Sequence, residues 1–216
     1  MNEKWSKFIY EETSQYFLPP DCRGGVVIDC GSNVGAFPFR HNIRFDKYVC
    51  YEADPRNIDY MISLLPNELT QAYGINFTVE NRACYKTPDT TVPIYGRINE
   101  EDETDYWNSS GDSSIYTSER HLKENKIADV PTITIEEIRK EHFCEDCKDP
   151  IQLLKCDIEG AEHDFLLGKD ISIFKFISME IHGTETHSLD EMIEFISKTH
   201  FPIYVNDQIA TFRLKT

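Results

Sequence analysis

The chain has 216 residues, and its hydrophobic fraction of 40% is enough for one domain with a buried core. Its formal net charge is −16, from 38 acidic and 22 basic side chains, and no run of basic residues occurs. This balance argues against an electrostatically held nucleic acid, which requires Lys and Arg to neutralise phosphates, and suits a neutral or cationic small partner. The acidity could equally serve only solubility.

The first half of the chain is predicted to alternate strands and helices. An amphipathic helix with aromatic positions fills the first twenty residues and ends at Pro19-Pro20. It could cover a cofactor or cap the sheet, and we prefer the second interpretation. The other elements predicted here are strands at 26–30, 48–52, within 75–81 and at 91–95, and helices at 36–44 and 55–65.

The second half continues the alternation after a polar stretch. Residues 99–114 are acidic, Ser-rich and poor in apolar groups, so we expect a loop there, within a substrate-side insert that spans 96–130. Beyond it the predicted elements are helices at 135–142, 161–167 and 190–199, and strands at 151–156, 175–181, 203–205 and 210–214. The order predicts a single α/β domain over 1–216, with a mostly parallel sheet, helices on both faces and a C-terminal antiparallel hairpin.

The loop after the first strand is the most informative segment. It runs from Asp29 through Gly31, Ser32 and Asn33 to Gly35, and its glycines would let the backbone approach a nucleotide-like ligand. The glycine spacing of dinucleotide-binding turns is missing, and an acid at the entrance would repel phosphate but attract an ammonium group. We therefore expect S-adenosylmethionine rather than NAD as the cofactor.

The next two strand ends extend this predicted cofactor site. Glu52 ends the second strand about twenty residues beyond the first glycine, where such folds place the acid that binds ribose hydroxyls. Ala53 follows it directly, and Asn81 and Arg82 follow the third strand. Together with Asp157, these residues complete the set that we expect to bind the cofactor.

A second constellation lies at the end of the strand 151–156. This strand delivers Asp157 and Glu159 to the carboxyl edge of the sheet, where open α/β sheets bind ligands, so both acids should face the same crevice as Asp29. Lys155 lies inside the apolar strand and needs a partner, which one of these acids could provide.

The following strand ends in Glu180-Ile181-His182. His182 is the expected general base, because the ordinary pKa of histidine lies near about 6.5, and His163 ranks below it. Asp157 and Glu159 are alternative bases, or could orient sugar hydroxyls. With His182 they could instead hold a divalent cation such as Mg²⁺, which would lower the pKa of the acceptor.

These motifs together resemble the FkbM family of S-adenosylmethionine-dependent methyltransferases. The resemblance covers roughly residues 24–183 and implies a seven-stranded class I methyltransferase fold with O-methylation, often of sugar hydroxyls in glycans or natural products. The run Lys-x-Asp-x-Glu-Gly-x-Glu is its most specific part. The segments that carry the resemblance are 29–35, 51–55, 113–115, 132–138, 154–162 and 179–182.

Several alternatives stay open. The acceptor could be a phenol or a protein, and Tyr106, Trp107 and Tyr116 could stack on a sugar face or on a phenol, or simply pack the protein. An NAD-dependent oxidoreductase would share the fold, but the glycine spacing of its phosphate loop is missing from this chain. A binding-only module would not need acids at every strand end. The expected partner is a small-molecule or glycan acceptor, with no nucleic acid and no membrane span; the oligomeric state is left open.

The seven cysteines indicate thiols rather than a disulfide framework. They are odd in number and scattered through apparent strands, as at Cys30, Cys50 and Cys84, where cysteine behaves as a small hydrophobic residue. Cys144 and Cys147 have the spacing of zinc or redox sites, but no second pair follows them. With no signal peptide and no apolar run of membrane-spanning length, we expect a cytoplasmic protein.

Overall fold

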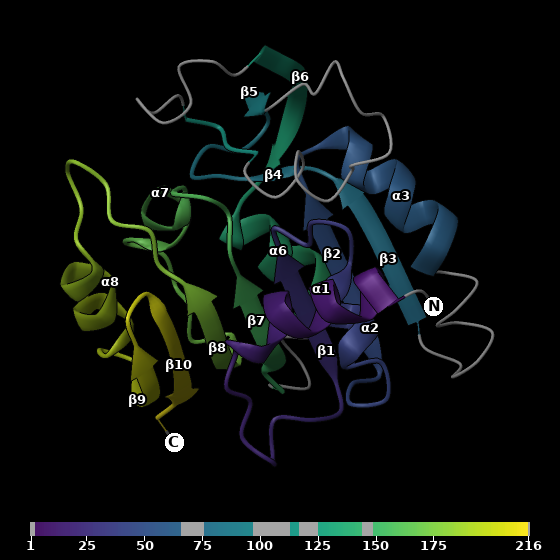
Figure 1. The fold of residues 1–216 in the computed structure, drawn as a ribbon. Helices are drawn as coiled ribbons and strands as arrows, with labels where there is room; N and C mark the ends of the chain where they lie inside the picture. Colours follow the sequence, from purple (N-terminus) through teal and green to yellow (C-terminus); the bar gives the residue numbers. More distant parts are fainter. Residues whose placement is uncertain (1–2, 66–75, 97–112, 117–124, 144–148, 216) are drawn as a thin grey trace.

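The computed structural model describes residues 3–65, 76–96, 113–116, 125–143 and 149–215, and its centre is a seven-stranded sheet (Figure 1). All neighbouring strands are parallel except β10, which lies antiparallel between β8 and β9. This confirms the predicted mostly parallel sheet and its terminal hairpin. In spatial order the strands are β3 (Asn76–Asn81), β2 (Lys47–Glu52), β1 (Val26–Cys30), β7 (Ile151–Cys156), β8 (Phe174–Glu180), β10 (Ile209–Leu214) and β9 (His200–Asn206).

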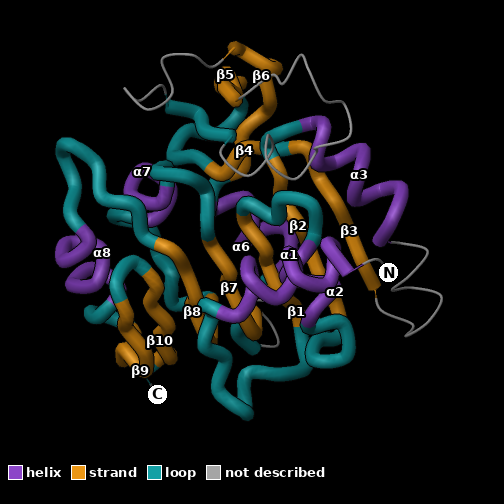
Figure 2. Tube along the Cα trace, in the orientation of Figure 1, coloured by secondary structure: helices purple, strands orange, loops and turns teal. Residues whose placement is uncertain are grey.

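Helices cover both faces of this sheet (Figure 2). Because successive strand residues point to opposite faces, Ile28 and Leu154 pack on one side and Val27 and Leu153 on the other. Strands buried on both faces read as continuous apolar runs, which is why their sequence signal was clear. The first face packs against α6 (Ile135–His142), α7 (Glu162–Leu166) and α8 (Leu189–Ile196); α2 (Ala36–Arg40) and α3 (Pro55–Leu65) cover the second, and α1 (Glu3–Ser14) lies on α2.

A small second sheet lies at the carboxyl edge of the large one. It contains β4 (Ala83–Cys84), β6 (Asn125–Ile133) and β5 (Thr91–Gly96), in that order. β6 is a strand that the sequence analysis did not predict: its charged residues and Pro131 weaken the strand pattern, and pairing with β4 and β5 compensates. Ser114 bridges to Tyr95 beside it. Most of the insert, with Tyr106 and Trp107, lies outside the described residues.

Two helices in the first half of the chain are shorter than predicted. α1 ends at Ser14 instead of Pro19, and α2 ends at Arg40 instead of Arg44. The Arg44 guanidinium donates hydrogen bonds to the carbonyls of Leu18, Pro19 and Cys22, and so satisfies backbone oxygens of the segment that follows α1.

The cysteines of the described chain agree with the expected thiols. Cys22, Cys30, Cys50, Cys84 and Cys156 are all free and buried, whereas the pair at 144 and 147 lies outside the described residues. No helix in the described part of the chain has the length and apolar character needed to cross a membrane.

Gly31 provides a test of how tightly β1 and β7 are joined. A Cβ at Gly31 would lie 1.7 Å from the Asp157 carbonyl oxygen, and its φ of 70° disfavours a side chain. We expect Gly31→Ala to lower the free energy of unfolding by at least about 3 kcal/mol. Gly168→Ala is the control, because its φ is 77° but nothing lies within 4 Å, so only about 1 kcal/mol should be lost. Equal losses in urea unfolding would contradict the close approach.

Candidate active site

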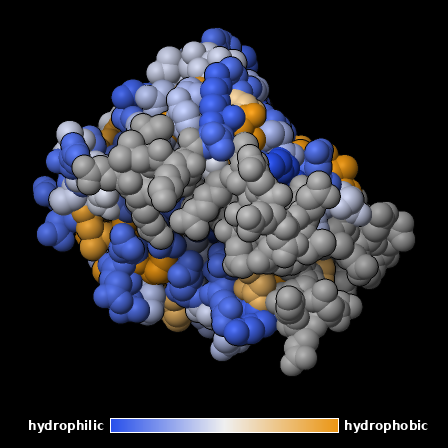
Figure 3. Space-filling view, turned by 45° about the horizontal axis from the view of Figure 1, so that its top comes forward, coloured by the Kyte–Doolittle hydropathy of each residue, from blue (hydrophilic) through white to orange (hydrophobic). Residues whose placement is uncertain are grey.

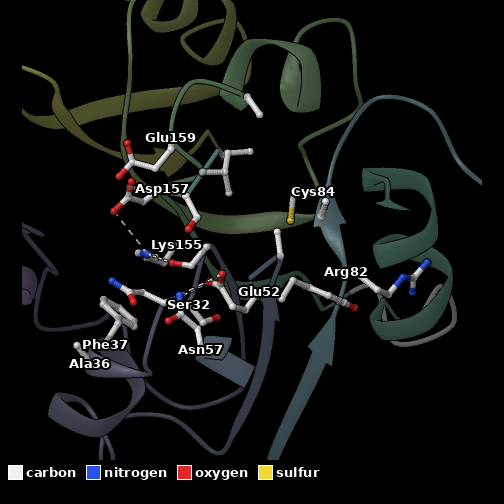
Figure 4. Close-up of a pocket in the computed structure, with 18 of the residues that line it drawn as sticks. Ser32, Ala36, Phe37, Glu52, Asn57, Arg82, Cys84, Lys155, Asp157 and Glu159 are labelled. Atoms are coloured by element: carbon white, nitrogen blue, oxygen red, sulfur yellow. Dashed lines mark hydrogen bonds and ion pairs between the residues drawn. The ribbon is translucent and has the colours of Figure 1, made fainter. Parts of the chain in front are cut away.

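One pocket opens at the carboxyl ends of β1, β2 and β7 (Figure 4). Its floor is the loop of Gly31, Ser32 and Asn33, as predicted, and α1 and the segment around β5 also contribute to its lining. The predicted residues that line it are Gly31, Ser32, Asn33, Glu52, Ala53, Arg82, Asp157 and Glu159, whereas Asp29, Gly35, Asn81 and His182 do not.

A buried ion pair lies beneath the pocket floor. Parallel register sets Asp29 of β1 beside Lys155 of β7, and the ammonium lies 3.5 Å from the carboxylate. Lys155 also donates a 2.8 Å hydrogen bond to the Gly31 carbonyl. Burial opposes the charged amine, but the carboxylates of Asp29 and Asp157 raise the pKa of Lys155, which stays protonated.

Asp29 therefore has a different place from the one predicted. It is completely buried and faces Lys155, so it cannot meet an ammonium group of a ligand in the pocket. The expectation that Asp29 contacts the cofactor directly is corrected: it holds the lysine that positions the Gly31 carbonyl. Asp157 or Glu159 was the expected partner of Lys155; Asp29 is the nearest carboxylate, and Asp157 also pairs with the amine, at 3.8 Å.

Glu52 lies in the pocket, where the sequence placed it. The residue is only 6% exposed. Its carboxylate accepts hydrogen bonds from the backbone N–H groups of Asn33, at 2.7 Å, and Asp54, at 2.8 Å. Asn57 donates to it at 3.4 Å. Burial, with the charge of Asp54, raises the pKa of Glu52 to about 7 against the effect of these hydrogen bonds.

Three predicted cofactor residues, Asn81, Arg82 and Gly35, contact the elements around the pocket. Asn81 donates to the carbonyls of Glu52 and Ala53, at 2.9 and 3.0 Å, and so fixes the chain that follows β2. The Arg82 guanidinium points away from the pocket toward α6 (Figure 4), where it pairs with Glu137 at 3.1 Å and Glu141 at 3.3 Å. Gly35, with a φ of 82°, precedes the first residue of α2. These positions join the pocket to the neighbouring elements.

The N-terminal segment forms part of the pocket wall. The sequence analysis had preferred a helix that caps the sheet to one that covers a ligand. Glu12, Thr13 and Tyr16 line the pocket, and the Tyr16 hydroxyl donates a 2.7 Å hydrogen bond to Asp157. Glu12 and Thr13 lie in the last turn of α1 and Tyr16 follows its end, and a helix pattern does not tell which element lies opposite.

The loop after β7 carries the predicted acids. Asp157 is held by Tyr16, and Glu159 follows with a φ of 52° in the left-handed region, which is unusual for a residue other than glycine. Asn33 on the opposite side of the pocket has a φ of 50°. Such conformations persist where the surrounding structure imposes them, and they concentrate at functional sites.

His182 lies beside these acids. Its Nδ1 is 3.1 Å from the buried Glu162, and its Nε2 is 3.6 Å from both Glu159 and Glu180. Burial opposes protonation, but the hydrogen bond to Glu162 and the surrounding carboxylates raise the pKa of His182 to about 9. This corrects the expectation of a base with an ordinary pKa. The lower-ranked His163 is buried on α7, near the carbonyl of Ser188.

The predicted metal set also changes. In the described chain, the residues whose ligand atoms all lie within 4.8 Å of one another are Asp157, Glu180 and His182, so Glu180 replaces Glu159.

Figure 3 turns the carboxyl edge of the sheet toward the viewer and shows mostly hydrophilic described surface, with apolar residues in separate small patches.

The fold and this pocket define a class of protein. A parallel sheet in the order β3-β2-β1-β7-β8-β10-β9, with one inserted antiparallel strand and an acid at the end of β2, is the class I methyltransferase architecture. A family model described as the methyltransferase FkbM domain matches residues 29–203. The chain therefore belongs to the FkbM methyltransferase family, as its motifs indicated.

Three solved structures illustrate the degree of similarity. The FkbM methyltransferase of Methylobacillus flagellatus KT is similar with a TM-score of 0.51 and 16% identity, over 88% of this chain but only 43% of that chain. M. capricolum TrmK has a TM-score of 0.46 and 7% identity, over 100% of this chain and 70% of its own. Magnesium protoporphyrin IX methyltransferase from Synechocystis has a TM-score of 0.41 and 6% identity, over 99% of this chain and 79% of its own. No curated protein matches the chain significantly.

The raised pKa of Glu52 makes stability depend on pH. Its folded-state pKa, about 7, exceeds the ordinary 4.5, so its contribution to stability is complete below about pH 4.5 and is lost as pH rises through about 7. From about pH 5.5 to about pH 8, the wild type should lose roughly 2 kcal/mol more unfolding free energy than Glu52→Gln. Urea unfolding at both pH values measures this, and parallel losses in the two proteins would contradict a raised pKa.

Proposed function

We propose that this protein is an S-adenosylmethionine-dependent O-methyltransferase that acts on a sugar hydroxyl of a glycan or glycosylated metabolite. The observation that carries the proposal is the pocket between Glu52 and the acids of the β7 loop, Asp157 and Glu159. Family membership supports the methyl transfer. The chain spans less than half of the FkbM structure from Methylobacillus. The cofactor and the acceptor are therefore proposed from this chain's own residues.

Glu52 supports the choice of cofactor. When bound, S-adenosylmethionine supplies an electrophilic methyl group. An ionised Glu52, oriented by the N–H groups of Asn33 and Asp54, can accept hydrogen bonds from ribose hydroxyls. Phosphate is disfavoured, because the two basic residues of the described pocket lining, Lys155 and Arg82, are already paired with carboxylates.

The acids of the β7 loop support a hydroxyl acceptor. Methyl transfer to oxygen requires that the acceptor be aligned and its proton removed. One Asp157 oxygen already accepts from Tyr16, whereas the Glu159 side chain is 35% exposed and lines the pocket. We assign proton removal to Glu159 and acceptor orientation to Asp157. His182, which was the first choice for the base, lies behind Glu159 and outside the lining.

The first test separates the proposed cofactor from NAD. Isothermal titration with S-adenosylhomocysteine should show binding to the wild type and at least about tenfold weaker binding to Glu52→Gln, because the amide loses the charge-assisted hydrogen bonds to ribose. Glu185→Gln removes an exposed carboxylate away from the pocket and should bind like the wild type. Tight binding of NADH with none of S-adenosylhomocysteine would refute the cofactor assignment.

The second test concerns the acceptor and the base. Transfer of labelled methyl from S-adenosylmethionine to a panel of methyl glycosides should be detectable with the wild type. In Glu159→Gln, kcat should fall by about 100-fold, the usual scale of general base catalysis, while affinity for S-adenosylhomocysteine stays within about twofold. Undiminished kcat in a folded variant would remove Glu159 as the base. Methylation of simple phenols but of no glycoside would overturn the sugar acceptor.

A further inference from the structure

A compact cluster of ligand-type side chains borders the pocket at Asp157. Asp157 follows β7, Glu180 ends β8, and His182 comes two residues later, so parallel strand ends bring all three to one edge. One ligand atom from each lies within 4.8 Å of the others, and all three side chains are partly buried. The proximity alone would not distinguish a metal site from an ion-pair network.

The orientation of His182 is the feature that favours a metal. Its Nδ1 lies 3.1 Å from a carboxylate oxygen of Glu162, which leaves Nε2 directed at the cluster, 3.6 Å from Glu180. Metal-binding histidines usually donate the other ring N–H to a carboxylate in this way, which fixes the tautomer and the ring orientation.

Glu162 itself is an independent sign of missing positive charge. It is completely buried, and one oxygen accepts from the N–H groups of Ile158 and Gly160 as well as facing His182. The other oxygen has no hydrogen-bond partner among the described residues. A buried carboxylate left partly unsatisfied is costly, and a cation held by His182 would compensate it.

The groups around the cluster do not supply the positive charge that its carboxylates need. Gln15 donates to one oxygen of Glu180, at 3.3 Å, while the other oxygen is the one that faces His182. Lys155, the nearest amine to Asp157, is already shared between Asp29 and the Gly31 carbonyl. The described cluster thus has more carboxylates than cations.

We propose that Asp157, Glu180 and His182 bind a divalent transition-metal ion of the Mn²⁺ type, with Glu162 orienting the histidine. One imidazole with two carboxylates suits such an ion better than Ca²⁺, which prefers an all-oxygen set. The inference deepens the proposed function: a cation at the pocket edge would coordinate the acceptor hydroxyl and lower its pKa, and Glu159 would take the proton.

Direct binding of Mn²⁺ alone tests the site without any acceptor. Electron paramagnetic resonance should show one Mn²⁺ bound per wild-type chain, and at least about tenfold weaker binding in the near-isosteric Glu180→Gln. Glu185→Gln carries the same charge change on an exposed residue outside the cluster and should bind like the wild type. Equal weakening in both variants would mean a diffuse effect of net charge and would overturn the site.

A second variant and a parallel measurement keep the outcomes separate. Glu162→Gln should weaken Mn²⁺ binding by about 10- to 100-fold, the usual effect of losing an orienting carboxylate. S-adenosylhomocysteine is titrated into the same samples. If it binds while Mn²⁺ does not, the metal site is wrong and the cofactor proposal stands; if only Mn²⁺ binds, the cofactor proposal fails and the metal site stands.

Discussion

The pocket depends on one buried interaction, the ion pair between Lys155 and Asp29. It joins the two central strands at the point where both turn into ligand-facing loops, and its amine also holds the Gly31 carbonyl. Gly31 in turn leaves no space for a side chain, because the backbone of Asp157 fills it. Removing the lysine would leave Asp29 buried and unpaired, which is more costly than the pair itself is stabilising, and removing Asp29 would leave the lysine with Asp157 alone as its counter-charge. The geometry of both loops therefore rests on this pair.

In the pocket above that ion pair, carboxylates outnumber positively charged groups among the described residues. Glu52, Asp157 and Glu159 line the pocket, and the described cations near them, Lys155 and His182, are each shared with several carboxylates. Burial already shifts the pKa of Glu52 upward, so the folded protein keeps a carboxylate in a place that disfavours its charge. Groups fixed in this manner are preorganised for a ligand that brings hydrogen-bond donors or positive charge, and they lose little by reorganisation when it binds.

Local sequence patterns were sufficient for the strands and for the loops that directly follow them. The apolar runs of β1 and β7 are visible because both faces are buried, and Glu52 and Glu159 follow from strand ends alone. The side-chain directions were not predictable in this way. Asp29 points below the floor because its strand partner is Lys155, and Arg82 turns outward because α6 presents Glu137 and Glu141.

Tertiary pairing likewise decided the elements that were missed or misjudged. β6 contains charges and a proline that weaken any strand pattern, and only β4 and β5 stabilise it. The first helix was identifiable as a helix, but its pattern does not reveal that Tyr16, just beyond its end, reaches Asp157. Helix periodicity specifies a buried face and leaves open what that face covers.

The segment at residues 113–116, beside β5, contacts both sides of the pocket. Ser114 donates a 2.8 Å hydrogen bond to the carbonyl of Glu159, the residue held in the left-handed region, and Ser113 donates to Asp54 beside Glu52. An unfavourable backbone conformation persists only where neighbours impose it, so this serine pair helps to hold both sides of the pocket. Changes in the adjoining insert can therefore alter the position of the proposed base as well as the shape that the acceptor meets.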